Sequence, residues 1–340
     1  MSGIGHPTEV ERRPLLEWLL RRHPETPRTR AKQWIQSGRV SVGGVAVRKP
    51  QEMMRDPGAG LGLSQRGATT LDCGEGWQVH PRVGLLYLDT SLAIVNKGPG
   101  LISVPAEGVT ISALSILADF LAGKLRARDR GVAGKTLPAV YRKLEILPVH
   151  RLDQFTSGAL CMATHPAARE HLIEQLRTHT MDRGYVAFCE GRSKSTSGTW
   201  RNWLELSADE MRQQIVSASR GEARGSAAQE AITHFKVIGE YVLADGKTVV
   251  TKLRLKLETG RKHQIRVQAA HAGLALIGDR AYNPKYRGLQ AVAPIAFDRQ
   301  ALHAEVLSLQ HPASGSRLTW RAPMPKDLRQ LEAALGASRI

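Results

Sequence analysis

The strongest constraint on the fold lies in the stretch His150–Gly158, His-Arg-Leu-Asp-Gln-Phe-Thr-Ser-Gly, and in the apolar run 159–162 that follows it. Polar residues and a glycine directly before apolar residues are typical of a turn that leads into a buried strand. Loops at the edge of a sheet often carry chemistry, because the strand fixes the ends of the loop. Asp153 is therefore the first candidate for a catalytic group. On this motif alone, a simple pairing with Arg151 or a turn-capping role explains Asp153 as well.

The charge balance of the chain points to a polyanionic partner. Its 48 Lys and Arg residues against 31 Asp and Glu residues give a net charge of +17 over 340 residues, a length that suits two domains of roughly 100–200 residues each. Nucleic acid is the first expectation for such a protein. No apolar run approaches the roughly 20 residues of a membrane helix, and the N-terminus lacks the apolar core of a signal peptide. We therefore expect a cytoplasmic protein.

The cysteines and glycines give no sign of a metal or nucleotide site. Cys73, Cys161 and Cys189 are widely spaced, form no Cys-x-x-Cys pair and lack His neighbours at zinc spacing. We expect reduced thiols, two of them in core strands. The turn 98–100 is glycine-rich, but no Gly-Lys-Ser/Thr pattern follows it, so a phosphate loop is not indicated.

The first 50 residues carry the pattern of a small unit with two helices and a hairpin. Apolar residues 15–20 follow Pro14, a second helix is expected after Thr26 and Pro27 with a stop at Gly38, and valines alternate about Gly43-Gly44. Between residues 11 and 50, ten Lys or Arg residues against three Glu residues give a net charge of +7. A solvated basic face and an RNA-binding face both explain this charge. The order helix, helix, hairpin resembles the S-four-type RNA-binding domain, and the resemblance implies RNA contacts by Arg28, Arg30 and Lys32.

The next segment, residues 51–82, contains six glycines and two prolines and is expected to be mostly linker. Its end, Leu71 to His80, could still close the small unit with a further strand. We therefore expect an RNA-binding unit with its linker at residues 10–80 and a catalytic unit at residues 81–330.

The larger unit shows alternating signals for strands and helices. Strands are expected at 92–95, 159–163, 185–189 and 251–257, and helices after Thr110 and Thr164, each capped by that threonine. In the last of these strands Leu alternates with Lys and Arg, so that one face is apolar and the other cationic. The segments 124–143 and 207–228 are expected to be a basic loop and an exposed insertion.

A second dense cluster, residues 259–267, follows the cationic strand. On a helix, His263 and Arg266 share a face with Ala270, so Arg266 is directed inward among small residues. A buried arginine needs a carboxylate or phosphate partner. Asp153 is the natural partner, either in a catalytic site or as a purely structural ion pair.

Together these clusters resemble the RluA family of pseudouridine synthases over residues 84–325. The residues that carry the resemblance are His150-Arg151-Leu152-Asp153 with Thr156-Ser157-Gly158, Tyr185-Val186-Ala187, Gly260-Arg261-x-His263-Gln264-Ile265-Arg266, Gly278-Asp279-x-x-Tyr282 and Leu302-His303-Ala304. His150 before Arg151 favours this branch over the related RsuA type, which has glycine there.

The resemblance implies an α+β fold with a mixed, mostly antiparallel sheet, flanking helices and a central basic cleft. It also implies isomerisation of uridine in RNA by a monomer, without cofactor or metal, since the glycosidic bond is cut and the base is rejoined through carbon. Asp153 would act as nucleophile or as proton acceptor. Substrate contacts would come from Arg151, which replaces the flipped base, from Tyr185, which stacks under the uracil and helps remove the final proton, and from Arg266, which favours the ionised carboxylate; Arg261 would contact the RNA.

Two rival functions remain open at this point. One is a non-catalytic RNA-binding or ribosome-assembly factor on the same scaffold, and the other is a regulator that binds DNA. RNA suits the S-four-type unit and base flipping better, and no DNA-reading helix-turn-helix is evident. Large-subunit ribosomal RNA is the first expectation for the substrate, and transfer RNA is the second.

Overall fold

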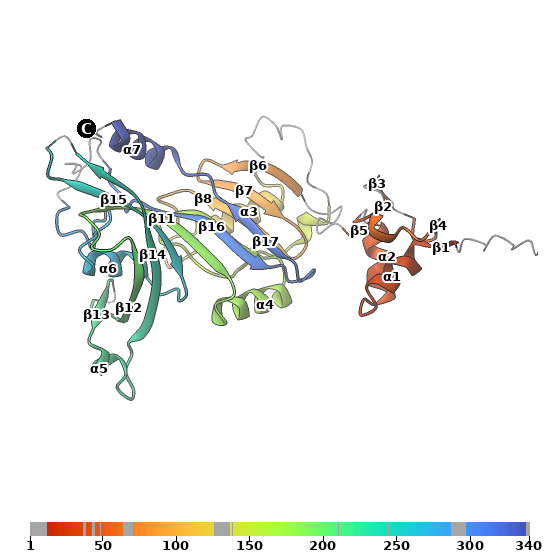
Figure 1. Cartoon of the computed structure of the whole chain (residues 1–340), viewed down its shortest axis with the longest axis horizontal. Helices are drawn as coiled ribbons and strands as arrows, with labels where there is room; N and C mark the ends of the chain where they lie inside the picture. Colours follow the sequence, from red (N-terminus) through yellow and green to blue (C-terminus); the bar gives the residue numbers. More distant parts are fainter. Residues whose placement is uncertain are drawn as a thin grey trace, which may run out of the picture. The chain divides into compact units, whose positions relative to one another are not determined.

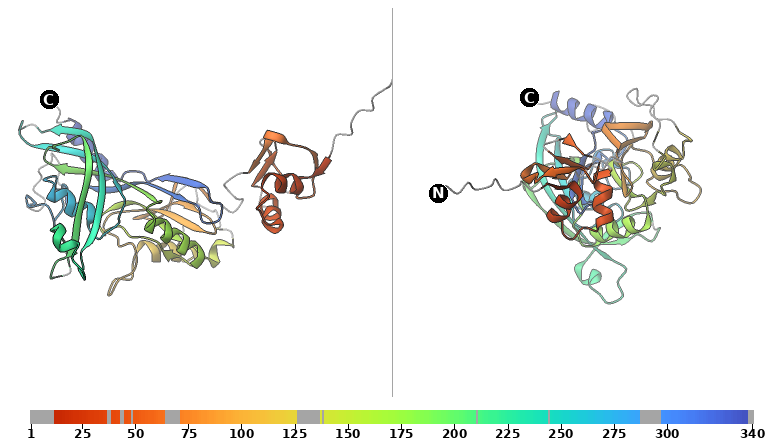
Figure 2. Two further views of the ribbon diagram at one scale, coloured as in Figure 1. Left: turned by 60° about the horizontal axis from the view of Figure 1, so that its bottom comes forward. Right: turned by 90° about the vertical axis from the view of Figure 1, so that its right-hand side faces the viewer.

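The chain divides into two compact units, residues 1–71 and 72–340 (Figures 1 and 2). This computed structural model describes residues 12–36, 39–42, 45–47, 49–63, 71–125, 137, 139–209, 211–243, 245–286 and 297–337. Among these residues, no helix is both long enough and apolar enough to cross a membrane.

The smaller unit contains the predicted helices, α1 (Leu15–Arg22) and α2 (Arg28–Gln36), and the predicted hairpin of β2 (Val40–Val42) and β3 (Val45–Ala46). Gly38 and the Gly43-Gly44 turn lie outside the described residues. Its core is closed by apolar residues from the helices and strands: Leu15, Leu16, Trp18, Leu19, Ala31, Ile35, Val40 and Leu61. The spacing of these residues along α1 and α2 therefore did identify the buried faces.

The stretch 51–82 is not mostly linker, as the sequence suggested. β4 (Met53–Arg55) pairs with β1 (Arg12–Pro14), and after the 3-10 turn η1 (Gly58–Gly60), β5 (Leu61–Leu63) pairs with β2. β6 (Leu71–His80) joins the sheet of the larger unit rather than closing the smaller one. Pairing with strands that are distant in sequence outweighs the weak strand preference of glycine.

One mixed sheet organises the larger unit (Figure 1). In the described residues its strand order is β13-β12-β14-β15-β11-β16-β10-β8-β7-β6, with β17 beside β16 and β9 beside β10. The strands are β7 (Val83–Leu88), β8 (Leu92–Lys97), β9 (Leu147–Pro148), β10 (Ser157–Ala163), β11 (Asp182–Glu190), β12 (Ser197–Leu206), β13 (Gln213–Val216), β14 (Gln229–Val242), β15 (Val249–Leu257), β16 (Leu302–Gln310) and β17 (Arg317–Arg321). This confirms the predicted α+β fold with a mostly antiparallel sheet.

The parallel pair β10–β16 lies at the centre of this sheet, with Gly158 opposite Ala304. Gly158 has a φ of +124°, and a Cβ there would lie 2.2 Å from the carbonyl oxygen of Ala304. Only glycine allows the turn before β10 to enter the sheet so close to β16. Every residue of β10 is buried, as the apolar run predicted.

The helices of the larger unit are α3 (Ala113–Leu121), α4 (Pro166–Arg177), α5 (Ala218–Gly221), α6 (Gln264–His271) and α7 (Lys326–Ala337), with a 3-10 turn η2 (Tyr141–Lys143). The predicted caps Thr110 and Thr164 are wrong. Ser112 caps α3 in a reciprocal pair with Ser115, and the His165 side chain accepts the N–H of Ala168 at the start of α4.

Other predictions for the larger unit are confirmed or corrected as follows. The apolar face of β15 is buried, and Cys161 and Cys189 are free thiols in core strands. The segment 207–228 is not only an exposed insertion, because it contains β13 and α5. Of the predicted basic loop, residues 126–136 and 138 lie outside the described part of the chain.

Candidate active site

Asp153 lies on a turn whose backbone carbonyl oxygens accept hydrogen bonds from four different residues. The Ser103 hydroxyl bonds both the N–H and the carbonyl oxygen of Leu152, at 2.9 Å each. The carbonyl oxygens of Asp153, Gln154 and Phe155 accept bonds from the Thr156 N–H (3.0 Å), Lys97 Nζ (3.1 Å) and Arg299 Nη1 (3.1 Å), respectively. A turn fixed in this way presents its side chains in a defined geometry.

Lys97 is the least expected of these donors, because its side chain is fully buried. Its Nζ also donates to the carbonyl oxygens of Gly98 (3.0 Å) and Leu101 (2.8 Å), so that three acceptors surround three donors. Burial lowers the pKa of Lys97 to about 7, although the nearby Asp153 carboxylate opposes this shift. The lysine thus binds two loops together beside the candidate catalytic group.

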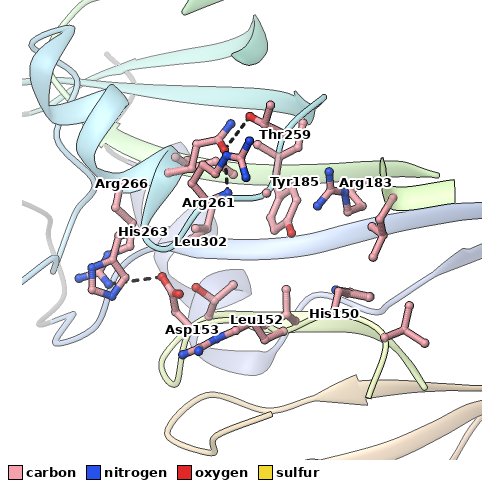
Figure 3. Close-up of a pocket in the computed structure, with 18 of the residues that line it drawn as sticks. His150, Leu152, Asp153, Arg183, Tyr185, Thr259, Arg261, His263, Arg266 and Leu302 are labelled. Atoms are coloured by element: carbon pink, nitrogen blue, oxygen red, sulfur yellow. Dashed lines mark hydrogen bonds and ion pairs between the residues drawn. The ribbon is translucent and has the colours of Figure 1, made fainter. Parts of the chain in front are cut away.

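Asp153 faces a pocket of about 560 Å³ between its turn, β11 and the start of α6 (Figure 3). Five of the residues singled out in the sequence line this pocket: Arg151, Asp153, Tyr185, Arg261 and Arg266. Three separate parts of the sequence therefore meet in one cavity. The other three, Arg28, Arg30 and Lys32, are exposed on the smaller unit.

Arg266 contacts two carboxylates, of which Asp153 is the weaker partner. Its Nη1 lies 3.3 Å from Asp153 Oδ2, as the sequence suggested, but Nε and Nη2 bond Asp279 at 2.7 and 2.8 Å. The Arg266 side chain is 9% exposed and that of Asp279 is 0% exposed. The sequence did not identify this role of Asp279, because a buried arginine indicates an acidic partner but not which one, and the bidentate contact is seen only in the structure.

His263 and Tyr282 both contact or border Arg266. The Tyr282 hydroxyl accepts the N–H of Gln213 at 2.7 Å and lies 3.0 Å from His263 Nδ1. Burial and the positive charge of Arg266 lower the pKa of His263 to about 4 despite Asp153, so the imidazole is neutral at pH 7. The Arg266 guanidinium also packs on the Tyr282 ring, 5.1 Å from its centroid. The orientation of Arg266 is thus fixed by its surroundings.

Tyr185 and Arg183 lie across the pocket from Asp153, on β11 (Figure 3). Burial raises the pKa of Tyr185, so its ring is a neutral phenol at pH 7. Arg183 is 8% exposed, and its one side-chain hydrogen bond in the described part of the chain runs from Nη2 to the Glu258 carbonyl oxygen. A Cβ on Gly260 would lie 2.4 Å from Arg183 Nη1, so the glycine makes room for this cation. Sequence reasoning did not select Arg183.

The two remaining arginines differ in their contacts. Arg151 is exposed at the rim and forms no ion pair with any described residue. Arg261 is also exposed, but its Nε donates to the Glu230 carbonyl oxygen at 3.1 Å. No cluster of three or more His, Cys, Asp or Glu side chains within the described ranges is arranged to hold a metal ion.

The arrangement can support acid–base or nucleophilic chemistry by one carboxylate. Asp153 is partly open to the pocket, its side chain being 19% exposed, and Arg266 offers it a positive charge without full neutralisation. Opposite it, the Tyr185 phenol ring provides a flat surface, and the Arg183 guanidinium has an Nε without a hydrogen-bond partner among the described residues. A planar, neutral group with carbonyl oxygens suits such a cavity.

Comparison with known proteins agrees with these features. The RNA pseudouridylate synthase family pattern matches residues 91–271, and the S4 domain pattern matches residues 13–58. Ribosomal large subunit pseudouridine synthase D of Pseudomonas aeruginosa is 31% identical over 330 residues, which cover 93% of this chain and 90% of that protein. A protein of Bacillus subtilis named uncharacterized RNA pseudouridine synthase YlyB is 30% identical, over 89% of this chain and 88% of its own length.

The fold of the larger unit also occurs in solved structures. Human RNA pseudouridylate synthase domain containing 1 superposes with a TM-score of 0.51 at 22% identity, covering 76% of this chain and 96% of the human chain. A likeness at this identity concerns the fold, whereas the family follows from the sequence matches. The chain belongs to the RluA family of RNA pseudouridine synthases and carries an S4 domain at its N-terminus.

Proposed function

We propose that this protein isomerises uridine to pseudouridine in large-subunit ribosomal RNA, with Asp153 as the catalytic residue. The observation that carries the proposal is the position of Asp153 on a rigid turn, facing the pocket and 3.3 Å from Arg266. The name of the relative from Pseudomonas aeruginosa supports the choice of ribosomal RNA as the substrate.

Four of the residues that line the pocket have a role in this proposal. Asp153 acts at the ribose or at the base while the bond from N1 to C1′ breaks and the bond from C5 to C1′ forms; the C5 proton leaves and N1 gains a proton. Tyr185 stacks under the rotating uracil, and Arg183 offers its unused donors to a carbonyl oxygen or a phosphate. Arg151, at the rim, fills the gap that the flipped base leaves in the RNA.

The smaller unit is proposed to bind RNA without taking part in the chemistry. Its α2 presents Arg28, Arg30 and Lys32 to solvent, and cations of this kind bind phosphates in a salt-dependent manner. We further propose that the protein acts as a monomer in the cytoplasm, where ribosomal RNA is matured. Its molar mass in solution tests the first of these statements.

The test is a map of pseudouridines in ribosomal and transfer RNA from cells with and without the gene. We expect one or more sites in large-subunit RNA to be lost in the deletion strain and regained with the wild-type gene, but not with Asp153→Asn. RNA from the deletion strain should be modified by the purified protein. Loss of sites in transfer RNA alone would overturn the assigned substrate, and an unchanged map with an inactive purified protein would favour an assembly factor.

A further inference from the structure

Phe155 is an exposed aromatic residue on the turn that carries Asp153. Its side chain is 38% exposed, whereas Leu152 and Thr156 on the same turn are 5% and 2% exposed. The exposure does not come from a loose backbone, because the Phe155 carbonyl oxygen is bound by Arg299, which is itself held by Asp327 at 2.6 and 3.0 Å. Phe155 therefore presents an apolar ring to solvent from an ordered backbone beside Asp153.

The ring borders a second pocket of about 400 Å³, which we call the Phe155 pocket. Arg151, Asp153 and Arg266 line both this pocket and the one that contains Tyr185, so the two cavities meet at Asp153. The remaining walls of the Phe155 pocket come from residues 102–106 and from the segments around Arg280 and Arg299. A molecule bound at Asp153 therefore has a neighbouring cavity within reach.

Arg280 gives the Phe155 pocket a positive charge next to its aromatic surface. The guanidinium carbon lies 6.0 Å from the centre of the Phe155 ring, and Asp298 holds the guanidinium in place. The Arg280 side chain is nevertheless 56% exposed, and Arg151 is exposed on the shared wall. An aromatic ring with arginines beside it is the combination that proteins use to stack an unpaired base and contact its phosphate.

We propose that the Phe155 pocket binds the base of a nucleotide adjacent in the RNA to the target uridine, stacked on Phe155, with Arg280 directed to the phosphate. This inference rests on the proposed function, because it assumes that the target uridine occupies the pocket at Tyr185. One phosphate joins neighbouring nucleotides, so a uridine that is flipped into the first pocket brings its neighbour to the entrance of the second. The neighbour is thereby unstacked from the RNA and needs a new surface.

The first experiment measures kcat and KM of full-length protein on unmodified ribosomal RNA from the deletion strain. Phe155→Ala is expected to raise KM by roughly fivefold to a hundredfold, the range of base–aromatic stacking, and to leave kcat within about twofold. Phe155→Trp should restore the wild-type KM, while Phe155→Leu, apolar but without a ring, should not. Met211→Ala is the matched control, since Met211 is 70% exposed and lines neither pocket.

The second experiment uses a short synthetic RNA around the mapped uridine, with an abasic site on its 5′ or its 3′ side. At one of these two positions, removal of the base should raise the wild-type KM as much as Phe155→Ala does, and the two changes together should have little further effect. Additive effects at both positions, an unchanged KM, or a loss in kcat alone would overturn the inference. An inactive wild-type protein would instead overturn the proposed function, so the two failures are distinguishable.

Discussion

Asp153 and Asp279 both contact Arg266. An Asp→Asn substitution at each position therefore distinguishes an effect on catalysis from an effect on stability. Asp279→Asn keeps the shape of the side chain but removes the charge from a residue that is 0% exposed and bonds Arg266 at 2.7 and 2.8 Å. The cation is then left with the contact to Asp153 at 3.3 Å. Breaking a buried pair by removing one partner costs about 3–5 kcal/mol of folding free energy.

Asp153→Asn removes only the longer contact, from a side chain that is 19% exposed. Arg266 keeps both bonds to Asp279 in this variant, so the loss of stability should stay below about 1 kcal/mol. We therefore expect Asp153→Asn to be inactive and nearly as stable as the wild type. Asp279→Asn should be strongly destabilised, and its residual activity should fall because Arg266 is free to reorient.

Urea unfolding followed by tryptophan fluorescence measures the difference. Trp18 and Trp34 lie in the smaller unit, so a background with both changed to Phe leaves signals from Trp77, Trp200, Trp203 and Trp320 in the larger unit. A loss of 3–5 kcal/mol should lower the urea midpoint by about 1 M or more. If the two variants lose equal stability, or if Asp279→Asn loses less than about 1 kcal/mol, Asp279 is not the principal partner of Arg266 and the reasoning is refuted.

Three further predictions concern catalysis, RNA binding and pH. Asp153→Asn should abolish isomerisation while RNA affinity stays largely intact; turnover within about tenfold of wild type, or ~1.4 kcal/mol in barrier, would refute the catalytic assignment. Deleting residues 1–71 should weaken binding and lower the log–log salt slope by about 0.7–0.9 per lost phosphate contact, and a reduced rate at saturating RNA with the slope unchanged would contradict our division of roles. Burial and the Arg183 charge lower the pKa of His150 to about 3, so the unfolded chain binds more protons and stability should fall as pH drops from about 6.5 toward 3. The test compares the urea midpoint at pH 7.5 with that at pH 5. His150→Gln can still accept the N–H of Cys161, and its midpoint should fall less between these pH values than that of the wild type. An equal fall in both proteins would contradict the role of His150.

The sequence was most informative where short-range patterns decide the structure. The apolar face of α1, the valines of β2 and β3, and the alternation along β15 each reflect a periodicity within one element. The caps of α3 and α4 depended on a shift of one or two residues, which propensity alone does not resolve. The glycine-rich strand β6 is stabilised by partners elsewhere in the chain, so local composition misled the prediction.

The same limit applies to the candidate site. The sequence could show that a buried Arg266 needs an acidic partner, and the contact with Asp153 exists. The sequence could not show whether Asp153 or Asp279 is the closer partner of Arg266, since that depends on how the segment after Gly278 approaches α6. The burial of Lys97 and Arg183 could not be predicted from the sequence either, because each side chain donates to a carbonyl oxygen of a loop that is far away in the sequence.

The position of β16 has a consequence for the order in which the protein can mature during synthesis. β16 (Leu302–Gln310) lies between β10 and β11 in the sheet, although both of those strands are made more than a hundred residues earlier. Until β16 has left the ribosome, β10, which follows the Asp153 turn, and β11, which carries Tyr185, lack the strand that lies between them in the sheet. The smaller unit can fold early, whereas the pocket at Asp153 closes only after β16 has been made. A nascent chain should therefore be able to bind RNA before it can modify RNA.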